Sequence, residues 1–541
     1  MTRKTLPIAV LLILLQGVNL WAQLDVGIVL PFENNTRDPN LEWISEGFVE
    51  SLTSNLASPR VLMLGRRERA AAFDTLGIPH ANILSLATVY TVAKELDATR
   101  VIIGSYEYKD GALVADAQLL EMDGPRVAEK FTESGALKDL MELQTGLAWQ
   151  IQSYLRPNLT LSKIEYIKEQ KGPRLEAFEN YIRGLLSTER APQIRYLREA
   201  QRLDARYTKP AFDLGMIYFQ DEDYPTSVPW LSKLQRGDED YLEANYFLGL
   251  AYLKLGQYER SAAALRVIAQ RLPLNEVQNN LGIALSRQER PGAVQYFEKA
   301  VQNEPEDPDY QFNLGYTYWK QGRYEEALGP LKNALQLQRR PLWWTVYIQS
   351  LEKANQTAES AQQKQLFQQQ FSGWVAPPNL DNLERPKDDY DGVSLHQLLM
   401  LVQIQTEQKH QKLTLEEHVA LHYQRAQELE KEGFEREAID ELQLAIEYDP
   451  DDAPSYQELA RLYLKSDRYE EASKSLSRSL QREENADSYL LLAKVYLEQG
   501  KLAEAEAQLN AALRLKPYST EAATLREEIN ARTPASQDSR R

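Results

Sequence analysis

The sequence of 541 residues contains no cysteine. This absence excludes disulfides, thiolate zinc sites, cysteine nucleophiles and a lipid anchor on an N-terminal Cys. Basic residues are also in deficit, because 62 Lys and Arg face 79 Asp and Glu and leave a net charge of −17. The basic surface of a nucleic-acid-binding protein is therefore missing. Gly and Pro contribute only 25 residues each, which excludes collagen-like and low-complexity chains. The composition predicts a folded acidic protein.

Signatures of catalysis are missing as well. The sequence has no G-x-x-x-x-G-K-[ST], G-x-G-x-x-G, G-x-S-x-G or H-E-x-x-H pattern. His418 and His422 lie four residues apart on a predicted helix, which is a metal-ligand spacing, but no third ligand accompanies them. Adjacent acidic pairs fall in turns between predicted helices, where a solvated face is expected. We expect no catalytic residue, no metal and no cofactor, and hence no enzyme.

The first residues predict an export signal. Arg3 and Lys4 precede an apolar run from Leu6 to Leu15, and the segment ends at Trp21 and Ala22. A charged start, an apolar middle and a small residue before the cleavage point are typical of a secretory signal peptide, here residues 1–22. An uncleaved N-terminal anchor is the alternative. Export and the absence of cysteine together predict a periplasmic or otherwise extracytoplasmic protein that does not depend on disulfides. The mature chain is expected to have no transmembrane segment.

An α+β domain is predicted over residues 24–155. Short apolar runs bounded by turn residues indicate strands, apolar residues at helical spacing indicate helices, and Asp110-Gly111 indicates a two-residue hairpin. The predicted strands are 25–34, 60–64, 100–106 and 112–121, and the predicted helices are 39–57, 83–97 and 136–155. Together they predict a sheet with helices packed against it.

Three segments of this domain carry a family resemblance. They are LPFEN, then EGF at Glu46 to Phe48, then AKELDATRVIIGSYEYKDGALVADAQLLE. This order resembles the amino-terminal α/β domain of TolB and of CsgG-like envelope proteins. No TolB propeller follows, and the lipidated Cys of CsgG-like pores is absent, so a Tol-system role and a pore role are not implied. The resemblance implies an envelope-associated scaffold domain.

Internal repetition dominates the rest of the chain. Gly215, Gly249, Gly282 and Gly315 follow one another at intervals of 34, 33 and 33 residues, each preceded by Leu. This period and the small residue at a fixed position are typical of tetratricopeptide (TPR) repeats, in which two helices approach closely. Both blocks of the chain resemble this family. The sequence predicts an all-α TPR solenoid of helix-turn-helix repeats after the α+β domain.

The period divides the solenoid into two blocks. Residues 174–371 are predicted to hold about five repeats and a degenerate pair, and residues 419–532 three repeats and a capping helix. Residues 372–418, rich in Pro and acidic residues at their start, are predicted to be a linker with an amphipathic helix and a possible hinge. Residues 533–541 are expected to be a disordered tail.

The concave groove of the first block is the candidate binding site. Fixed positions of each first helix line the groove in this family, so the resemblance allows them to be counted off. The candidate partner-binding residues are Phe212, Phe219, Tyr246, Lys254, Asn279, Arg287, Phe312, Tyr316, Trp319 and Lys320. Aromatic side chains are typical of interaction hot spots, although part of them would be core between repeats. Lys254, Arg287 and Lys320 resemble an incomplete carboxylate clamp and favour an acidic or C-terminal peptide.

Three functions follow from these observations. The first is an exported, non-enzymatic protein-interaction scaffold of the bacterial envelope, whose partners are proteins or peptides and not nucleic acid. The alternative is a ligand-sensing protein, in which the α+β domain binds a small molecule and the repeats relay the state to a partner; a deep apolar pocket in residues 25–155 would favour it. The third is an unrecognised enzyme, which would require a convergent polar cluster.

Overall fold

A computed structural model describes most of the chain and divides it into two compact units, residues 1–407 and 408–541. The described residues are 25–58, 61–79, 84–122, 126–156, 161–170, 172–269, 272, 274–290, 292–388, 395–396, 398–401, 413–431 and 435–532. The predicted signal peptide and the predicted tail at 533–541 lie outside them. The predicted class, an α+β domain followed by an all-α region of helical repeats, is confirmed, and the sheet of the first domain is mixed.

The first unit begins with a mixed sheet. Its strands are β1 Asp25–Val29, β2 Glu33–Asn34, β3 Val61–Leu64, β4 Arg100–Lys109, β5 Ala112–Glu121 and β6 Arg126–Gly135. The order is β3-β1-β4-β5-β6, with β2 paired to β4. Strand β1 runs parallel to β3 and β4, while β4, β5 and β6 form an antiparallel meander. The predicted hairpin is present, since Asp110 and Gly111 both have positive φ, as a two-residue turn requires.

Helices cover both faces of this sheet. Helices α2 Trp43–Leu56 and α5 Leu140–Leu155 share a hydrophobic core with one face, and α3 Arg66–Leu76 and α4 Leu86–Glu95 share another core with the opposite face. The predicted helix 39–57 is interrupted, because Asp38 caps a short 3-10 turn at Pro39–Leu41 before α2 begins. Helix α3 was not predicted, since its Arg-rich start conceals a short apolar stripe around Ala72 and Phe73.

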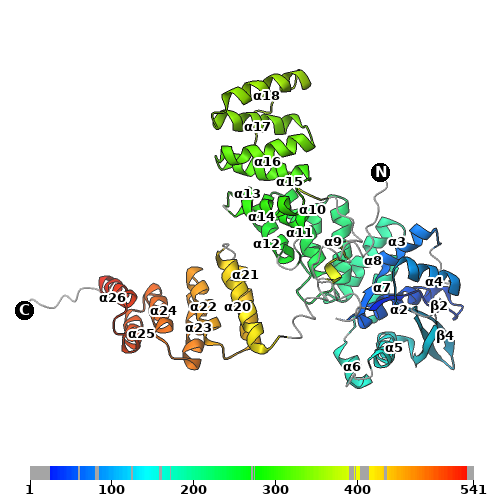
Figure 1. Cartoon of the computed structure of the whole chain (residues 1–541). Helices are drawn as coiled ribbons and strands as arrows, with labels where there is room; N and C mark the ends of the chain where they lie inside the picture. The colour runs from blue at the N-terminus through cyan, green and yellow to red at the C-terminus, as the bar shows by residue number, and fades with distance from the viewer. Residues whose placement is uncertain are drawn as a thin grey trace, which may run out of the picture. The chain divides into compact units, whose positions relative to one another are not determined.

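Helical pairs follow, stacked one on the next (Figure 1). The helices of the first unit are α6 Lys163–Glu169, α7 Leu175–Leu186, α8 Arg190–Leu203, α9 Lys209–Gln220, α10 Tyr224–Leu231, α11 Tyr241–Lys254, α12 Tyr258–Ala269, α13 Asn275–Ser286, α14 Ala293–Asn303, α15 Pro308–Lys320, α16 Tyr324–Leu337, α17 Pro341–Lys353 and α18 Thr357–Gln370. Phe178 and Ile182 of α7 belong to the same core as α2 and α5. The α/β domain and the first repeats therefore share one hydrophobic core.

The repeated glycines explain the close approach within each pair. A Cβ atom added at Gly249 would lie 2.5 Å from Leu265, and one added at Gly315 would lie 2.6 Å from Leu331, a residue of the second helix of the same pair. Real Cβ contacts do not occur at such distances, so an added methyl group would force the helices apart. This is the physical basis of the spacing found in the sequence.

After α18 the chain turns back along its own repeats. Residues 374–388 form neither helix nor strand, and residues 380–388, which we call the strap, lie against α13 and α15. Residues 395–396 and 398–401 are helical, with Leu395 and Leu399 buried. Leu401 completes the core on the α3 and α4 face of the sheet. Part of the segment predicted to be a linker is thus bound to the first unit.

The second unit is a stack of helical pairs. Its helices are α20 Leu415–Lys431, α21 Glu435–Tyr448, α22 Ala453–Lys465, α23 Tyr469–Arg482, α24 Ala486–Glu498, α25 Leu502–Leu515 and α26 Thr520–Arg532. Ala426, Ala460 and Ala493 are buried at 34- and 33-residue spacing, where the first block has glycine. Within the part of the chain that the structure describes, no helix is long and apolar enough to cross a membrane.

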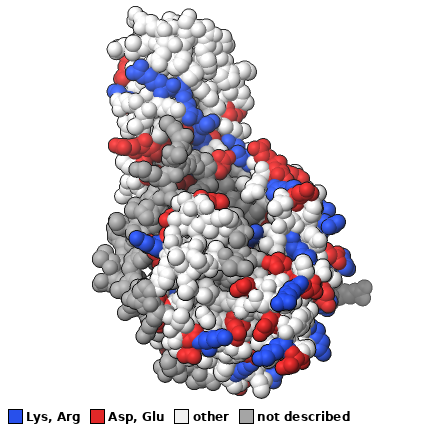
Figure 2. Space-filling model, turned by 90° about the vertical axis from the view of Figure 1, so that its right-hand side faces the viewer, with Lys and Arg blue, Asp and Glu red and all other residues white. Residues whose placement is uncertain are grey.

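Charge is mixed on the surface that Figure 2 presents. Acidic and basic side chains lie interspersed on this face. The net charge of −17 does not appear there as a continuous acidic field. A partner that meets this face would therefore meet charges of both signs.

Candidate functional site

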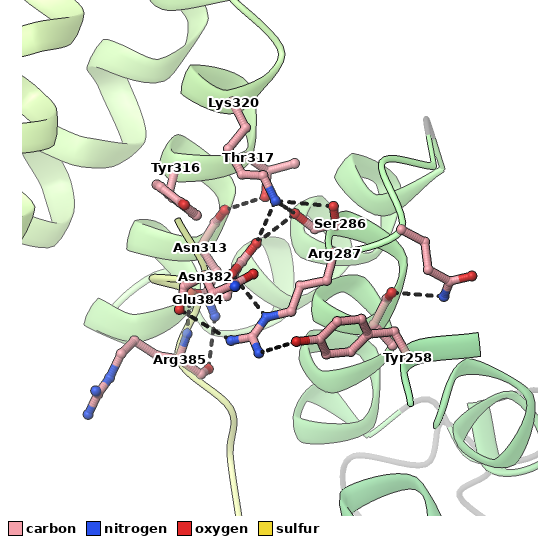
Figure 3. A network of polar contacts seen from close by, with 12 residues as sticks. Tyr258, Ser286, Arg287, Asn313, Tyr316, Thr317, Lys320, Asn382, Glu384 and Arg385 are labelled. Atoms are coloured by element: carbon pink, nitrogen blue, oxygen red, sulfur yellow. Dashed lines mark hydrogen bonds and ion pairs between the residues drawn. The ribbon is translucent and has the colours of Figure 1, made fainter. Parts of the chain in front are cut away.

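The candidate site is the face of α11, α13 and α15 that contacts the strap, called here the first-block groove. Figure 3 shows the strap crossing in front of α13 and α15, with polar side chains of both helices directed toward it. Lys254, Arg287 and Lys320 stand at the same place in three successive repeats, each five residues after the recurring glycine of its repeat. All three contact carboxylates of the strap.

Glu384 occupies the centre of this network. Its side chain is fully buried, with 0% exposure. One carboxylate oxygen accepts a hydrogen bond from Ser286 Oγ at 2.8 Å and lies 3.2 Å from Lys320 Nζ, and the other lies 3.3 Å from Arg287 Nε. A buried carboxylate is stable only with such partners. The groove therefore contains a pocket that neutralises one acidic side chain.

Two asparagines hold the strap through its backbone. Asn313 accepts from the Arg385 N–H at 2.7 Å and donates to the Arg385 carbonyl at 2.9 Å. Asn280 accepts from the Lys387 N–H at 2.9 Å and donates to the Lys387 carbonyl at 2.7 Å. Each side chain thus reproduces the pair of hydrogen bonds that a neighbouring β-strand would make. This mode of binding requires an extended chain and reads no side chain.

A second charged pocket receives Lys387. Its Nζ lies 2.8 Å from Asp307 and 2.9 Å from Asp309, and 5.2 Å from the centre of the Tyr310 ring. Burial alone would lower the pKa of Lys387, but its hydrogen bonds to Asp307 and Asp309 outweigh burial and raise it. The groove thus offers an acidic pocket beside the basic one, and their order along the strap is Glu384 and then Lys387.

The predicted groove residues divide into two groups. Lys254, Asn279, Arg287, Tyr316 and Lys320 contact the strap; Tyr316 donates to the Leu380 carbonyl at 2.6 Å, and Asn279 to the Arg385 carbonyl at 2.9 Å. The basic column holds side-chain carboxylates of an internal segment rather than a chain terminus.

The predicted aromatic residues lie mainly in packing contacts. The ring of Phe312 stacks on Trp343 at 4.7 Å, between two repeats, and Trp319 stacks on Tyr316. Phe212 is buried, with Arg67 of the α/β domain over its ring, while Phe219 and the buried Tyr246 both pack against Phe247. As partner contacts these five aromatics stay predictions.

Comparison with known proteins identifies the repeats. The tetratricopeptide-repeat model matches residues 212–276, 281–341 and 458–520, and a second tetratricopeptide model matches residues 441–472. Both blocks contain tetratricopeptide repeats. Among curated proteins, none matches the chain significantly.

Solved structures similar to parts of the chain include two MamA proteins. MamA AMB-1 is 23% identical, with 30% of this chain and 99% of that chain covered and a TM-score of 0.28. MamA MSR-1 is 24% identical, with 30% and 95% covered and a TM-score of 0.28. A likeness of this extent carries no argument about function.

Five residues of the TPR groove were missed in the sequence: Asn280, Ser286, Asp307, Asp309 and Asn313. A signal for the asparagines exists, because both precede Leu-Gly and stand 33 residues apart, at equivalent positions of successive TPR repeats. Recurrence of a polar amide at a buried repeat position indicates a backbone contact.

A second polar cluster joins the α/β domain to the TPR repeats. Arg67 of α3 lies 2.6 Å from Glu243 of α11, and His396 Nδ1 lies 2.8 Å from the other carboxylate oxygen of Glu243. Lys209 of α9 lies 2.8 Å from Ser54 of α2. These contacts cross from the sheet domain to the repeats, so the cluster fastens the two together.

Three residues of this cluster have the composition of a metal site. Ligand atoms of Asp240, Glu243 and His396 lie within 4.8 Å of one another. Burial alone would lower the pKa of His396, but the hydrogen bond and charge of Glu243 raise it to about 9. Burial and the neighbouring Glu239 raise the pKa of Asp240 to about 7. Arg67 and His396 both pair with Glu243, so the contacts in this structure are those of an ion-pair cluster.

The α/β domain has a small cavity of its own. It measures about 230 Å³, is lined by Leu30, Glu33, Asp116 and Lys130 among others, and opens to solvent. Typical small-molecule sites measure about 300–1,000 Å³ and are mostly apolar. This cavity is smaller and more polar than such a site.

His418 and His422 form packing contacts in the second block. Both rings stack on Tyr448, at 4.1 and 5.4 Å, and His422 Nδ1 lies 2.7 Å from Glu441. Both side chains thus take part in packing and polar contacts between α20 and α21.

Proposed function

We propose that the protein is an exported, non-enzymatic interaction scaffold of the bacterial cell envelope that binds extended segments of partner proteins in its first-block groove. The observation that carries this proposal is the pair of backbone clamps made by Asn280 and Asn313 on an extended segment. A surface that pairs with peptide backbone while two charged pockets hold side chains has the chemistry of a peptide-binding site.

Export to the envelope rests on the amino-terminal sequence. The charged start and apolar run of residues 1–22 support a secretory signal. The α/β domain, which resembles that of TolB and CsgG-like proteins, would serve as a second docking surface fixed to the repeats by their common core. N-terminal sequencing of the protein from cells is expected to give Gln23 as the first residue.

The small polar cavity of the α/β domain supports the scaffold over the ligand-sensing alternative. A sensor needs a site that encloses most of its ligand, and this open cavity of about 230 Å³ beside Glu33, Asp116 and Lys130 is small and polar for that purpose.

Affinity capture with three forms of the chain tests the proposal. The wild type carries the strap, the open-groove chain has residues 379–388 replaced by ten Gly and Ser, and a third form adds Arg287→Ala and Lys320→Ala to the open-groove chain. From envelope extract, a partner should be captured by the open-groove chain and lost with the third form. Circular dichroism must first show equal helix content. Identical captured proteins for all three forms, or none, would contradict the proposal.

A further inference from the structure

The strap is bound as a ligand would be bound. Its contacts come from residues 64 to 134 positions away in the sequence, and they combine backbone clamps with two side-chain pockets. Asp381, Asn382 and Arg385 are exposed, while Glu384 is fully buried. One side of the segment therefore contacts the groove and the other side faces solvent, as in a bound peptide.

The backbone contacts define the conformation that the groove accepts. Asn313 and Asn280 clamp residues 385 and 387, whose N–H and C=O groups point the same way in an extended chain. Pro386 stands between them, where no N–H is needed. Proline also biases the preceding residue, Arg385, toward extended backbone. The sequence of the strap is thus suited to the clamps without any loss of hydrogen bonds.

The side-chain contacts define which residues the groove distinguishes. The pocket of Ser286, Arg287 and Lys320 takes a carboxylate, and the pocket of Asp307 and Asp309 takes an ammonium group three residues later. Each pocket would repel the opposite charge, so the order of the two charges is read as well.

We propose, resting on the function above, that the first-block groove selects partner segments with Glu followed three residues later by Lys, Pro being favoured before the Lys, and that the strap is a resident competitor for such segments. The occupant in trans is an extended peptide segment of another protein. The strap is covalently attached, so its effective concentration at the groove is on the order of millimolar. A partner segment must therefore bind more tightly than the strap, or be present at a higher concentration, to displace it.

Fluorescence anisotropy with a labelled peptide of residues 377–388, PPNLDNLERPKD, tests the competition. The peptide is expected to bind the open-groove chain, and to bind the wild-type chain at least about 100-fold more weakly because of the attached strap. A chain with Glu384→Ala and Lys387→Ala, which keeps the strap backbone, should fall between them. Equal affinity for wild-type and open-groove chains would overturn the role of the strap.

Matched peptide variants test the selection of charge. Glu384→Gln in the peptide keeps the shape of the side chain but leaves Arg287 and Lys320 without a counter-charge. The affinity of the peptide is expected to fall by about 30-fold or more. Asp381→Asn removes the same charge at an exposed position, and a change within about two-fold is expected. Similar affinities for these two variants would overturn the selection while leaving peptide binding itself intact.

A charge exchange tests the second pocket. Asp309→Lys in the open-groove chain should weaken the wild-type peptide about 10-fold, and a peptide with Lys387→Glu should recover most of that loss. Asp309→Asn is the matched control, which should weaken the first peptide without favouring the second. No recovery by the exchanged peptide would exclude the pocket from selection.

Two outcomes would contradict more than the selection. If no peptide binds a folded open-groove chain, both the competition and the peptide-binding function of the groove fail. If the wild-type chain forms a dimer in mass photometry that the open-groove chain does not form, a second copy of the strap is the occupant and the proposed partner class is wrong.

Discussion

The basic residues of the two repeat blocks are neutralised in different ways. In the first block, Arg287 and Lys320 meet Glu384, which lies 97 and 64 residues further along the chain. In the second block, Arg461 pairs with Glu430 and Glu458, and Lys465 with Glu435, all on the same or the neighbouring helices. These cations of the second block are paired within its own repeats, whereas Arg287 and Lys320 of the first-block groove pair with a carboxylate from outside the repeats.

In a repeat protein, groove cations that have no carboxylate partner within their own repeats indicate where a ligand binds. Helix pairs of one fold expose equivalent positions, and the chemistry at these positions decides whether a ligand is needed. In the second block the positions equivalent to Asn280 and Asn313 hold Gln424, Glu458 and Leu491, so no Asn recurs there, and Gln424 donates to Glu428 of its own helix. The first block therefore carries the peptide chemistry.

The largest difference between the blocks is expected when the carboxylate that pairs with each set of cations is removed. Glu384→Gln should lower the free energy of strap opening by about 3 kcal/mol or more, because two cations lose a buried partner. Glu430→Gln should cost about 1 kcal/mol or less, because its partner Arg461 is 38% exposed and keeps its ion pair with Glu458. Hydrogen exchange at the amides of Arg385 and Lys387 measures the first, and exchange in α22 the second. Equal costs would remove the distinction between the blocks.

A dependence on pH should distinguish the first unit through His396. Its pKa of about 9 lies above the ordinary value of 6.5, so its contribution to stability is complete below about pH 6.5 and is lost as the pH rises through 9. The shift corresponds to about 3 kcal/mol at most. Thermal unfolding of the first unit should therefore move to lower temperature between pH 6.5 and 9.

The variant His396→Gln isolates this dependence. It should lose most of the pH slope between 6.5 and 9 while keeping helix content, whereas a slope equal to that of the wild type would show that another group is responsible. Asp240, whose pKa is about 7, is neutral below that value and gives a slope of the same sign at lower pH.

Adding a methyl group at the recurring small residue should destabilise the first block, whereas removing one at the equivalent position should destabilise the second. Gly315→Ala places a Cβ atom 2.6 Å from Leu331 and should cost about 1–3 kcal/mol. Ala460→Gly in the second block removes a methyl group that fits and should cost about 1 kcal/mol, mainly from helix propensity. Denaturant unfolding followed by hydrogen exchange can assign each loss to its block. A stabilising Gly315→Ala would contradict the steric explanation of the repeat.

The smallest effect is expected at the rim of the groove. Lys254 and Asp388 lie 2.5 Å apart, but their side chains are 36% and 41% exposed. Asp388→Asn should cost only about 0.2–1 kcal/mol of strap stability and should lose even that effect in high salt. Exchange of the strap amides at low and high salt measures it, and a loss as large as that of Glu384→Gln would place the centre of binding at Lys254 instead.

The helical pairs could be predicted from sequence because their cause is local. The 33- and 34-residue spacing of Gly215, Gly249, Gly282 and Gly315 follows from a steric requirement that each repeat meets by itself. The hairpin at Asp110-Gly111 is local in the same sense. Positions that depend on neighbours within one pair are accessible to a periodic argument.

The strap could not be predicted, because its contacts are not periodic. Pro, Asp and Asn in residues 374–388 give the composition of a solvated linker, and nothing in that composition indicates that Glu384 is buried. The basic column of Lys254, Arg287 and Lys320 predicted an acidic ligand, but its source lies in long-range folding of the same chain. The aromatic candidates were less informative, since rings such as Phe312 and Trp343 serve the packing between repeats.

The two clamps also relate the repeat to the length of what it binds. Asn280 and Asn313 are one repeat apart, and they hold residues 387 and 385, respectively, which are two residues apart. One repeat of the solenoid therefore advances a bound chain by two residues, about 6.6 Å in extended backbone. A third Asn-Leu-Gly repeat inserted in register would lengthen the recognised segment by one further two-residue step. The number of Asn-bearing repeats would therefore set the length of the segment that the groove binds.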